Sequence, residues 1–170
     1  MKKCEIYFAG GCFWGTEHFM KLINGVTDTQ VGYANGTVEN PSYQLVKTGA
    51  TGAAETVKVS YDAEKVDLKQ LIELYFKIID PTSLNHQGED TGTQYRTGIY
   101  YVDAADEPVI TAYLAQEAVN YDKPLVVEVL PLQNFYQAEE YHQDYLDKNP
   151  EGYCHVSPEL FAFARKANRS

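Results

Sequence analysis

The sequence predicts an α+β fold, a two-layer α/β sandwich with a mixed sheet and an irregular C-terminal segment. Segments of strand character alternate with segments of helical periodicity, as in layered folds. Neither a G-x-G-x-x-G turn nor a P-loop marks a nucleotide-binding sheet. No repeat or Pro/Gly/Ser-rich linker divides the 170 residues, a length that suits one domain. We therefore expect a single domain over residues 1–170, with 150–170 as an irregular tail.

The first half of the chain predicts three strands and a helix. A short apolar run at residues 4–10 indicates a buried strand, and 12–23 predicts a helix because its apolar residues recur at spacings of three and four. Residues 29–36 are typical of a strand that ends in an Asn-Gly turn. Apolar and polar residues alternate over 54–62, which predicts a half-buried strand with Glu55 at its start.

The second half begins with the clearest helix. One apolar stripe runs along residues 68–79, and Asp67 is a suitable N-cap. The sixteen residues 80–95 are polar and without periodicity, and loops of that length in a compact domain are usually functional or disordered.

Further strands and helices are expected beyond this loop. Strands at 97–102 and 125–129 flank a helix at 107–121, where Pro108 suits the first turn. Residues 138–146 predict the last helix, and the chain after Pro150 is expected to be irregular.

Composition excludes several classes of function. Fourteen basic against 24 acidic residues give a net charge of −10, which repels phosphate backbones and anionic membrane surfaces. No apolar run has membrane-spanning length, and Glu5 interrupts the short apolar stretch that follows the first two lysines. We therefore expect a cytoplasmic protein with no nucleic-acid or membrane partner.

The cysteine count argues against a disulfide framework and against a metal site. The three cysteines, Cys4, Cys12 and Cys154, form no CxxC or zinc-type cluster. Cys154 precedes His155, but the remaining histidines show no matching ligand spacing. We expect no bound metal.

The stretch GGCFWGT places Cys12 at the start of the predicted helix at 12–23. The free amides and the positive dipole end of a first helical turn lower a thiol's pKa from about 8.5 and favour the thiolate. A small buried hydrophobe is the alternative for such a cysteine. Phe13 and Trp14 are either core residues or the wall of an apolar pocket beside a reactive thiol.

Four stretches of the sequence, taken in order, are more specific than this motif alone. GCFWG resembles the active-site signature of the A-type peptide methionine sulfoxide reductases. Residues 40–57, 85–100 and 141–154 resemble that family's other blocks, in the same order and across nearly the whole chain. Ala53 and Glu39 depart from the pattern, since histidine is common at both positions, and these departures bear on substrate preference and pH optimum.

The resemblance implies a role for each matching residue. Cys12 is the nucleophile and Glu55 the acid, while Phe13 and Trp14 form the pocket for the substrate's methyl group. The polar frame consists of Tyr43, Asp90 and Tyr95. Chemistry supports the acid, because hydroxide leaves a sulfoxide poorly unless a proton arrives, and burial would keep a carboxyl protonated by raising its pKa from about 4.3.

The implied activity is reduction of methionine-S-sulfoxide, free or in proteins, without a metal, flavin or nicotinamide. Attack leaves a sulfenic acid on Cys12, which a second thiol condenses into a disulfide. Cys154 is the candidate for that thiol, whereas Cys4 is expected to be a buried core residue. Electrons come from thioredoxin or a similar dithiol protein, and the protein is expected to be a monomer.

Two other functions remain open on the residues alone. A cysteine hydrolase would activate Cys12 through a histidine, His18, His86 or His142. A peptide-binding module would use the Phe13/Trp14 pocket for unoxidised methionine. An acyl-enzyme would favour the hydrolase, and binding that survives loss of Cys12 would favour the module.

Overall fold

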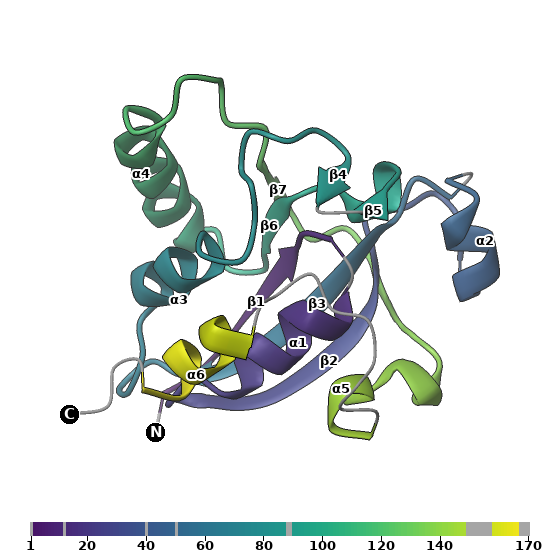
Figure 1. Ribbon diagram of the computed structural model, residues 1–170, viewed down its shortest axis with the longest axis horizontal. Helices are drawn as coiled ribbons and strands as arrows, with labels where there is room; N and C mark the ends of the chain where they lie inside the picture. Colours follow the sequence, from purple (N-terminus) through teal and green to yellow (C-terminus); the bar gives the residue numbers. More distant parts are fainter. Residues whose placement is uncertain are drawn as a thin grey trace.

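The computed structural model describes residues 2–11, 13–39, 41–49, 51–87, 90–148 and 158–166. Its centre is a mixed six-stranded sheet with the order β7-β6-β1-β3-β2-β8 (Figure 1). These strands are β1 (Lys3–Ala9), β2 (Val26–Ala34), β3 (Ala54–Asp62), β6 (Gly98–Tyr101), β7 (Glu128–Pro131) and β8 (Phe135–Gln137). All neighbouring strands are antiparallel except β6 and β7, which are parallel and joined through a helix.

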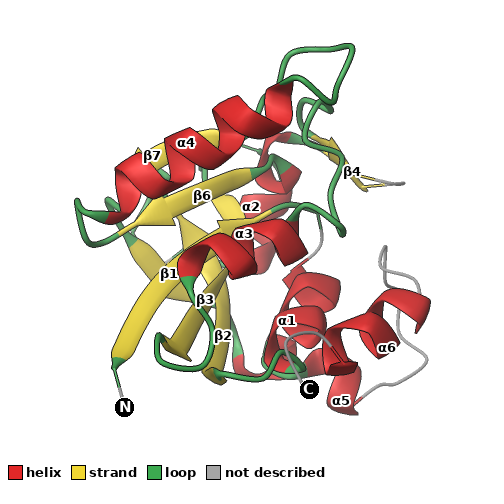
Figure 2. Cartoon of the chain, turned by 90° about the vertical axis from the view of Figure 1, so that its left-hand side faces the viewer, coloured by secondary structure: helices red, strands yellow, loops and turns green. Residues whose placement is uncertain are grey.

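Helices pack in two groups beside this sheet (Figure 2). One contains α3 (Leu68–Tyr75) and α4 (Asp106–Ala118), which contact each other. The other contains α1 (Phe13–Lys21), α5 (Tyr145–Lys148) and α6 (Pro158–Lys166), and α1 contacts both of its partners. The shorter elements are α2 (Tyr43–Lys47), β4 (His86–Gln87), β5 (Asp90–Thr91) and the 3-10 turns η1 (Thr93–Tyr95) and η2 (Glu140–His142).

The α+β fold class with a mixed sheet is confirmed, and so are most of the long elements. The helix expected over 12–23 is α1, and the helix expected over 68–79 begins with Asp67 as N-cap in a capping box, although it ends at Tyr75. The loop expected over 80–95 is not wholly irregular, because β4 and β5 pair with each other and η1 follows.

The half-buried character predicted for residues 54–62 is wrong. Every residue of β3 is buried except the partly exposed Lys58. A second apolar cluster explains this, because Tyr7, Ala54 and Tyr100 are buried together with partly buried Phe135 and Leu132 against them. The chain around Phe135 therefore covers a sheet face that sequence alternation assigns to solvent.

Two predictions near the C-terminus are also wrong. Residues 138–146 do not form one helix, because η2 ends at His142, Asp144 has a left-handed φ of 52°, and α5 starts only at Tyr145. The tail at 150–170 is not wholly irregular, since Pro158–Lys166 forms α6 and buries Ala164.

A tyrosine side chain of α3 holds the end of β1 in place. The buried Tyr75 hydroxyl donates to the carbonyl of Ala9 and accepts from the amide of Gly98 at 3.2 Å. A Cβ at Gly10 would meet Ile79 Cγ2, in the turn after α3, at 2.7 Å, so glycine allows the chain to pass this turn closely. These contacts determine where β1 stops and the turn before α1 begins.

Candidate active site

The site starts at the turn between β1 and α1. Gly11 has a φ of 69°, which favours glycine, and its amide donates to the carbonyl of Tyr95 at 3.1 Å. Thr16 on α1 donates its hydroxyl to the carbonyl of Gly10 at 3.2 Å. Both sides of position 12 are therefore held by hydrogen bonds, while Cys12 itself lies outside the described residues.

Glu55 reaches this turn from the neighbouring strand. Its Oε1 accepts the first-turn amide of Phe13 at 3.3 Å, and the side chain is only 1% exposed. An exposed surface position for Glu55 is thus excluded. Burial disfavours the charged form of a carboxyl, so this position suits a group that gives up a proton.

Phe13 and Trp14 occupy different environments. Phe13 is 1% exposed within the main core cluster, whereas Trp14 is partly buried at its margin. The Trp14 indole stacks on Tyr145, with ring centroids 3.7 Å apart, and its Nε1 donates to His142 Nδ1 at 3.0 Å. One face of the indole is therefore covered by Tyr145, the first residue of α5, and its polar edge is bonded to His142, the last residue of η2.

His142 lies at the centre of the aromatic side chains. Its ring centroid lies 4.6 Å from that of Tyr43 and 5.2 Å from that of Phe13. Burial lowers the pKa of His142, against a smaller opposing effect of Glu139, so the imidazole is neutral at pH 7. Because Nδ1 accepts the Trp14 hydrogen bond, the ring proton is on Nε2. An imidazole held in this way is poorly placed to activate a thiol in a hydrolase.

Glu139 connects Tyr43 to the sheet. Its carboxylate accepts the backbone amide of Tyr43 at 3.1 Å and the hydroxyl of Tyr33 at 2.9 Å. Burial by itself raises the pKa of Glu139, but these hydrogen bonds and one from its own amide outweigh burial, and the pKa lies below its ordinary value. Glu139 is therefore ionised at neutral pH and fixes the start of α2.

The structure describes the other predicted site residues only in part. Tyr95 is partly buried on η1 and contacts the turn through its carbonyl, as described above. Asp90 lies on β5, paired with Gln87, and the structure describes its backbone only. Cys154, the expected resolving thiol, lies outside the described residues.

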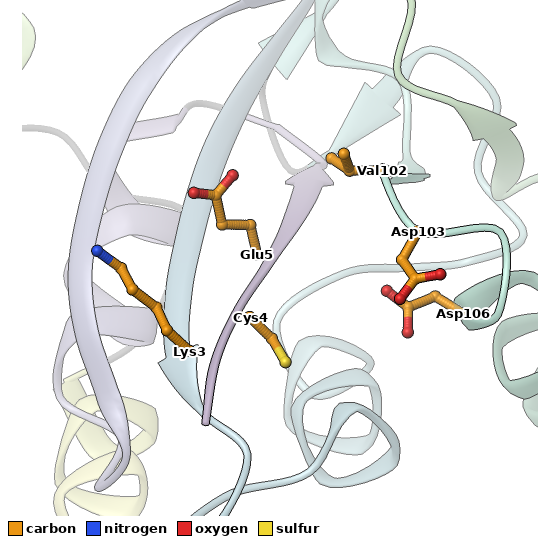
Figure 3. A pocket seen from close by; sticks show the side chains of 6 residues that line it. All are labelled: Lys3, Cys4, Glu5, Val102, Asp103 and Asp106. Carbon is orange, nitrogen blue, oxygen red and sulfur yellow. The ribbon is translucent and has the colours of Figure 1, made fainter. Parts of the chain in front are cut away.

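Cys4 is not a fully buried core residue, contrary to expectation. It is partly buried and lines a surface pocket of about 450 Å³ (Figure 3). The pocket is formed by Lys3, Cys4, Glu5, Val102, Asp103 and Asp106. Cys4 lies five positions before Ala9 on β1, which corresponds to about 17 Å at 3.3 Å per residue. A disulfide needs Cα atoms within about 7 Å, so Cys4 is remote from the turn at position 12.

Sequence reasoning missed the supporting residues Tyr145, Glu139 and Tyr33, and it considered His142 only as a possible base of a hydrolase. All but Tyr33 come from the 139–145 stretch, for which one continuous helix was expected. An aromatic-rich stretch with a histidine was the available signal, but only the fold brings it to Trp14, 128 residues earlier. Across the described ranges, no three His, Cys, Asp or Glu side chains gather as a metal site would require.

Comparison with known proteins identifies the class. The profile of the family described as peptide methionine sulfoxide reductase matches residues 4–169. A peptide methionine sulfoxide reductase MsrA of Clostridium acetobutylicum is 57% identical over 160 residues, covering 94% of this chain and 98% of the relative. The MsrA of Mycoplasma pneumoniae is 55% identical and covers 89% of this chain and 97% of its own length.

Solved structures agree with the sequence matches. Mxr1 from Saccharomyces cerevisiae in reduced form superposes with a TM-score of 0.85 at 41% identity, covering 90% of this chain and 89% of that one. Methionine sulfoxide reductase A of Corynebacterium diphtheriae gives 0.81 at 37% identity, covering 89% and 77%. Mxr1 in complex with Trx2 gives 0.61 at 27% identity, covering 85% of each chain.

The fold and the matches define an oxidoreductase. The chain belongs to the peptide methionine sulfoxide reductase family, and the relatives matched by sequence above are MsrA proteins. The family expected from the four sequence blocks is thereby confirmed. Within the described ranges, no helix has the length and apolar character needed to cross a membrane.

Proposed function

We propose that this protein reduces methionine-S-sulfoxide, free or in proteins, to methionine, with Cys12 as nucleophile and Glu55 as acid. The observation that carries the proposal is the buried Glu55 carboxyl, bonded to the first-turn amide of α1 directly after position 12. A buried carboxyl at the N-terminus of a helix that directly follows a cysteine in the sequence supports both partners that sulfoxide reduction needs, a thiolate and a proton.

The chemistry balances without a metal or organic cofactor. The Cys12 thiolate attacks the sulfoxide sulfur as Glu55 protonates the oxygen, so a sulfur–sulfur bond forms and the sulfur–oxygen bond breaks with release of hydroxide. This hydroxide then adds to the sulfur of Cys12 and breaks the sulfur–sulfur bond. The products are methionine and a sulfenic acid on Cys12, so sulfur of the substrate is reduced while sulfur of the enzyme is oxidised. Tyr43 and Tyr95 stabilise the charge that grows on oxygen, and Asp90 orders water or a phenol.

Substrate recognition rests on the aromatic side chains at the start of α1. Phe13 and Trp14 provide an apolar wall for the substrate's methyl group. The contacts of Trp14 with His142 and Tyr145 support this role, because they fix the position of an indole that remains partly exposed.

Recycling uses Cys154 and an external dithiol. Its thiol condenses with the sulfenic acid of Cys12, releasing water and forming a disulfide, which thioredoxin or a similar dithiol protein then reduces. The similarity to Mxr1, solved in complex with Trx2, supports a thioredoxin partner. We further propose that the protein acts as a single-domain monomer in the cytoplasm.

One experiment tests the reaction. The protein is incubated with dithiothreitol and each methionine sulfoxide epimer, and methionine is quantified for the parent and for Cys12→Ser. We expect turnover of the S epimer by the parent and none by the variant, since a serine hydroxyl is hardly ionised at neutral pH. Turnover of neither epimer by the parent refutes the activity, and activity in Cys12→Ser refutes the nucleophile.

A second experiment tests recycling. Cys154→Ser should complete one turnover, accumulate a sulfenic acid on Cys12 and stop cycling with thioredoxin, while a small dithiol still supports it. Cys4→Ser is the matched control and should cycle normally, because Cys4 lies at the far end of β1. Peptide mapping that finds a Cys4–Cys12 disulfide instead would transfer the role to Cys4.

A further inference from the structure

Glu17 is a buried carboxyl that the proposed reaction does not use. It follows Trp14 by three residues on α1, so both side chains lie on neighbouring parts of one helix face. The side chain is 1% exposed. Its Oε1 accepts the backbone amide of Asp144 at 2.8 Å, and its Oε2 accepts the hydroxyl of Thr29 on β2 at 3.0 Å.

Residues 142–145, which we term the 142–145 segment, are bonded both to β2 and to α1. Gln143 inserts its amide beside β2, accepting from the Val31 amide at 2.9 Å and donating to the Val31 carbonyl at 2.8 Å. The next residue, Asp144, is bonded to Glu17 through its amide and to Lys21 through its carboxylate. The two anchors hold the segment to β2 and to α1.

The anchored segment supplies both partners of the Trp14 indole. His142 accepts the indole N–H, and Tyr145 covers one indole face. Asp144, which lies between them, has a left-handed φ of 52°, a conformation that costs a non-glycine residue free energy and persists only where its surroundings hold it. The hydrogen bond from its amide to the buried Glu17 holds the backbone there, and the ion pair with Lys21 holds the side chain.

We propose that Glu17 is a positioning residue for the substrate pocket, because its carboxyl fixes the 142–145 segment and thereby the Trp14 indole. Glu17 touches neither the turn at position 12 nor Glu55 in any contact described above. Its loss should therefore weaken substrate recognition and leave the chemical step intact. The inference rests on the proposed function for its kinetic part, but the position of the indole can be measured without turnover.

Trp14 is the only tryptophan of the chain, so intrinsic fluorescence reports on this indole alone. Glu17→Leu fills a similar volume but accepts no hydrogen bond. We expect a red-shifted Trp14 emission, stronger acrylamide quenching, and a KM for the S-sulfoxide about tenfold higher, the order set by one buried hydrogen bond. The kcat with dithiothreitol should stay within about twofold of the parent.

Two matched variants separate this role from general destabilisation. Glu17→Gln keeps an acceptor for the Asp144 amide and can donate to Thr29, so it should retain the parent's emission and KM. Thr29→Val removes one partner of Glu17 but leaves the bond to Asp144, and it should also match the parent. If Glu17→Leu does not fold, Glu17→Asp, whose shorter side chain withdraws the carboxyl, should give the same changes more weakly.

The outcomes distinguish the two proposals. A Glu17→Leu or Glu17→Asp protein that is folded, with the parent's Trp14 emission and KM, overturns the positioning role. A red shift as large in Thr29→Val as in Glu17→Leu overturns it as well, because packing rather than the Asp144 bond would then hold the indole. If the parent reduces no sulfoxide, the proposed function fails, and the emission and quenching results still decide the role of Glu17.

Discussion

The unfolding free energy of the parent protein should fall as pH rises toward neutrality, because Glu17 is buried. Replacing Glu17 by glutamine should abolish this fall. Burial is the main cause that raises the pKa of Glu17 from 4.5 to about 7, with Asp144 adding to it, while hydrogen bonds from the Asp144 amide and Thr29 and the charge of Lys21 oppose it. Between these two values the folded protein holds a proton that the unfolded chain has released. The stability contributed by this group is complete below pH 4.5 and is lost as pH rises through about 7.

The magnitude follows from the size of that window. The interval from 4.5 to about 7, at about 1.36 kcal/mol per pKa unit, corresponds to about 3 kcal/mol. Glutamine does not ionise, so the unfolding free energy of Glu17→Gln relative to the parent should rise by about this amount between pH 4.5 and pH 8.5. For a chain of this length the same change amounts to roughly 6–12 °C in Tm.

Urea unfolding followed by circular dichroism, repeated at half-unit pH intervals, measures the effect. The control is Glu73→Gln, which alters an exposed carboxyl on α3. The curve of unfolding free energy against pH for this variant should run parallel to that of the parent. If the curves of Glu17→Gln and the parent are also parallel over this range, Glu17 does not hold its proton in the folded state and the reasoning is wrong.

Substitutions at three further positions test the rest of the site and its support. Glu55→Gln keeps the acceptor for the first-turn amide but has no proton to give, so the single-turnover rate should fall by roughly 10²- to 10⁴-fold; an unchanged rate at all pH values would remove Glu55 from the mechanism. Trp14→Ala should raise KM more than Trp14→Phe, because phenylalanine can still stack on Tyr145 although it loses the bond to His142; equal KM values in steady-state assays would argue against an apolar wall. Tyr75→Phe strands the carbonyl and the amide that its hydroxyl bridges and should cost about 1–3 kcal/mol in urea unfolding, and an unaltered midpoint would contradict this.

The sequence predicted the elements whose signal is local. The helix α1 follows from apolar residues at spacings of three and four, and the start of α3 follows from Asp67, which forms the capping box expected of an N-cap. The alternation along residues 54–62 correctly predicted a strand, but not its burial. The second face of β3 is covered by residues near Phe135, and nothing within the strand itself records that cover.

The errors near the C-terminus have two different causes. The break in residues 138–146 depends on the contacts of Gln143 with Val31 and of Asp144 with Glu17, more than a hundred residues away, and local propensity favours helix throughout. The helix α6, in contrast, carried local signals that were not used. Pro158 stands at its first position, Glu159 lies in its first turn, and basic residues lie in its last.

The site was predicted through its matching blocks rather than through its geometry. Glu55 and Tyr43 are unremarkable residues in the sequence, and only the fold brings Glu55 to the start of α1 and Tyr43 to His142. The structure adds what no short motif contains, namely that the indole of Trp14 is held by a stretch close to the other end of the chain.

The strand order of the sheet determines when the sheet can form during synthesis of the chain. β1 is made first, yet its neighbours are β3 and β6, and Tyr7 pairs with Tyr100. Such non-local pairing delays folding until distant segments have emerged from the ribosome. The side chains that hold the Trp14 indole, His142 and Tyr145, emerge later still. The segment that carries the proposed nucleophile is therefore synthesised well before the proposed substrate pocket is complete, and selectivity is acquired late.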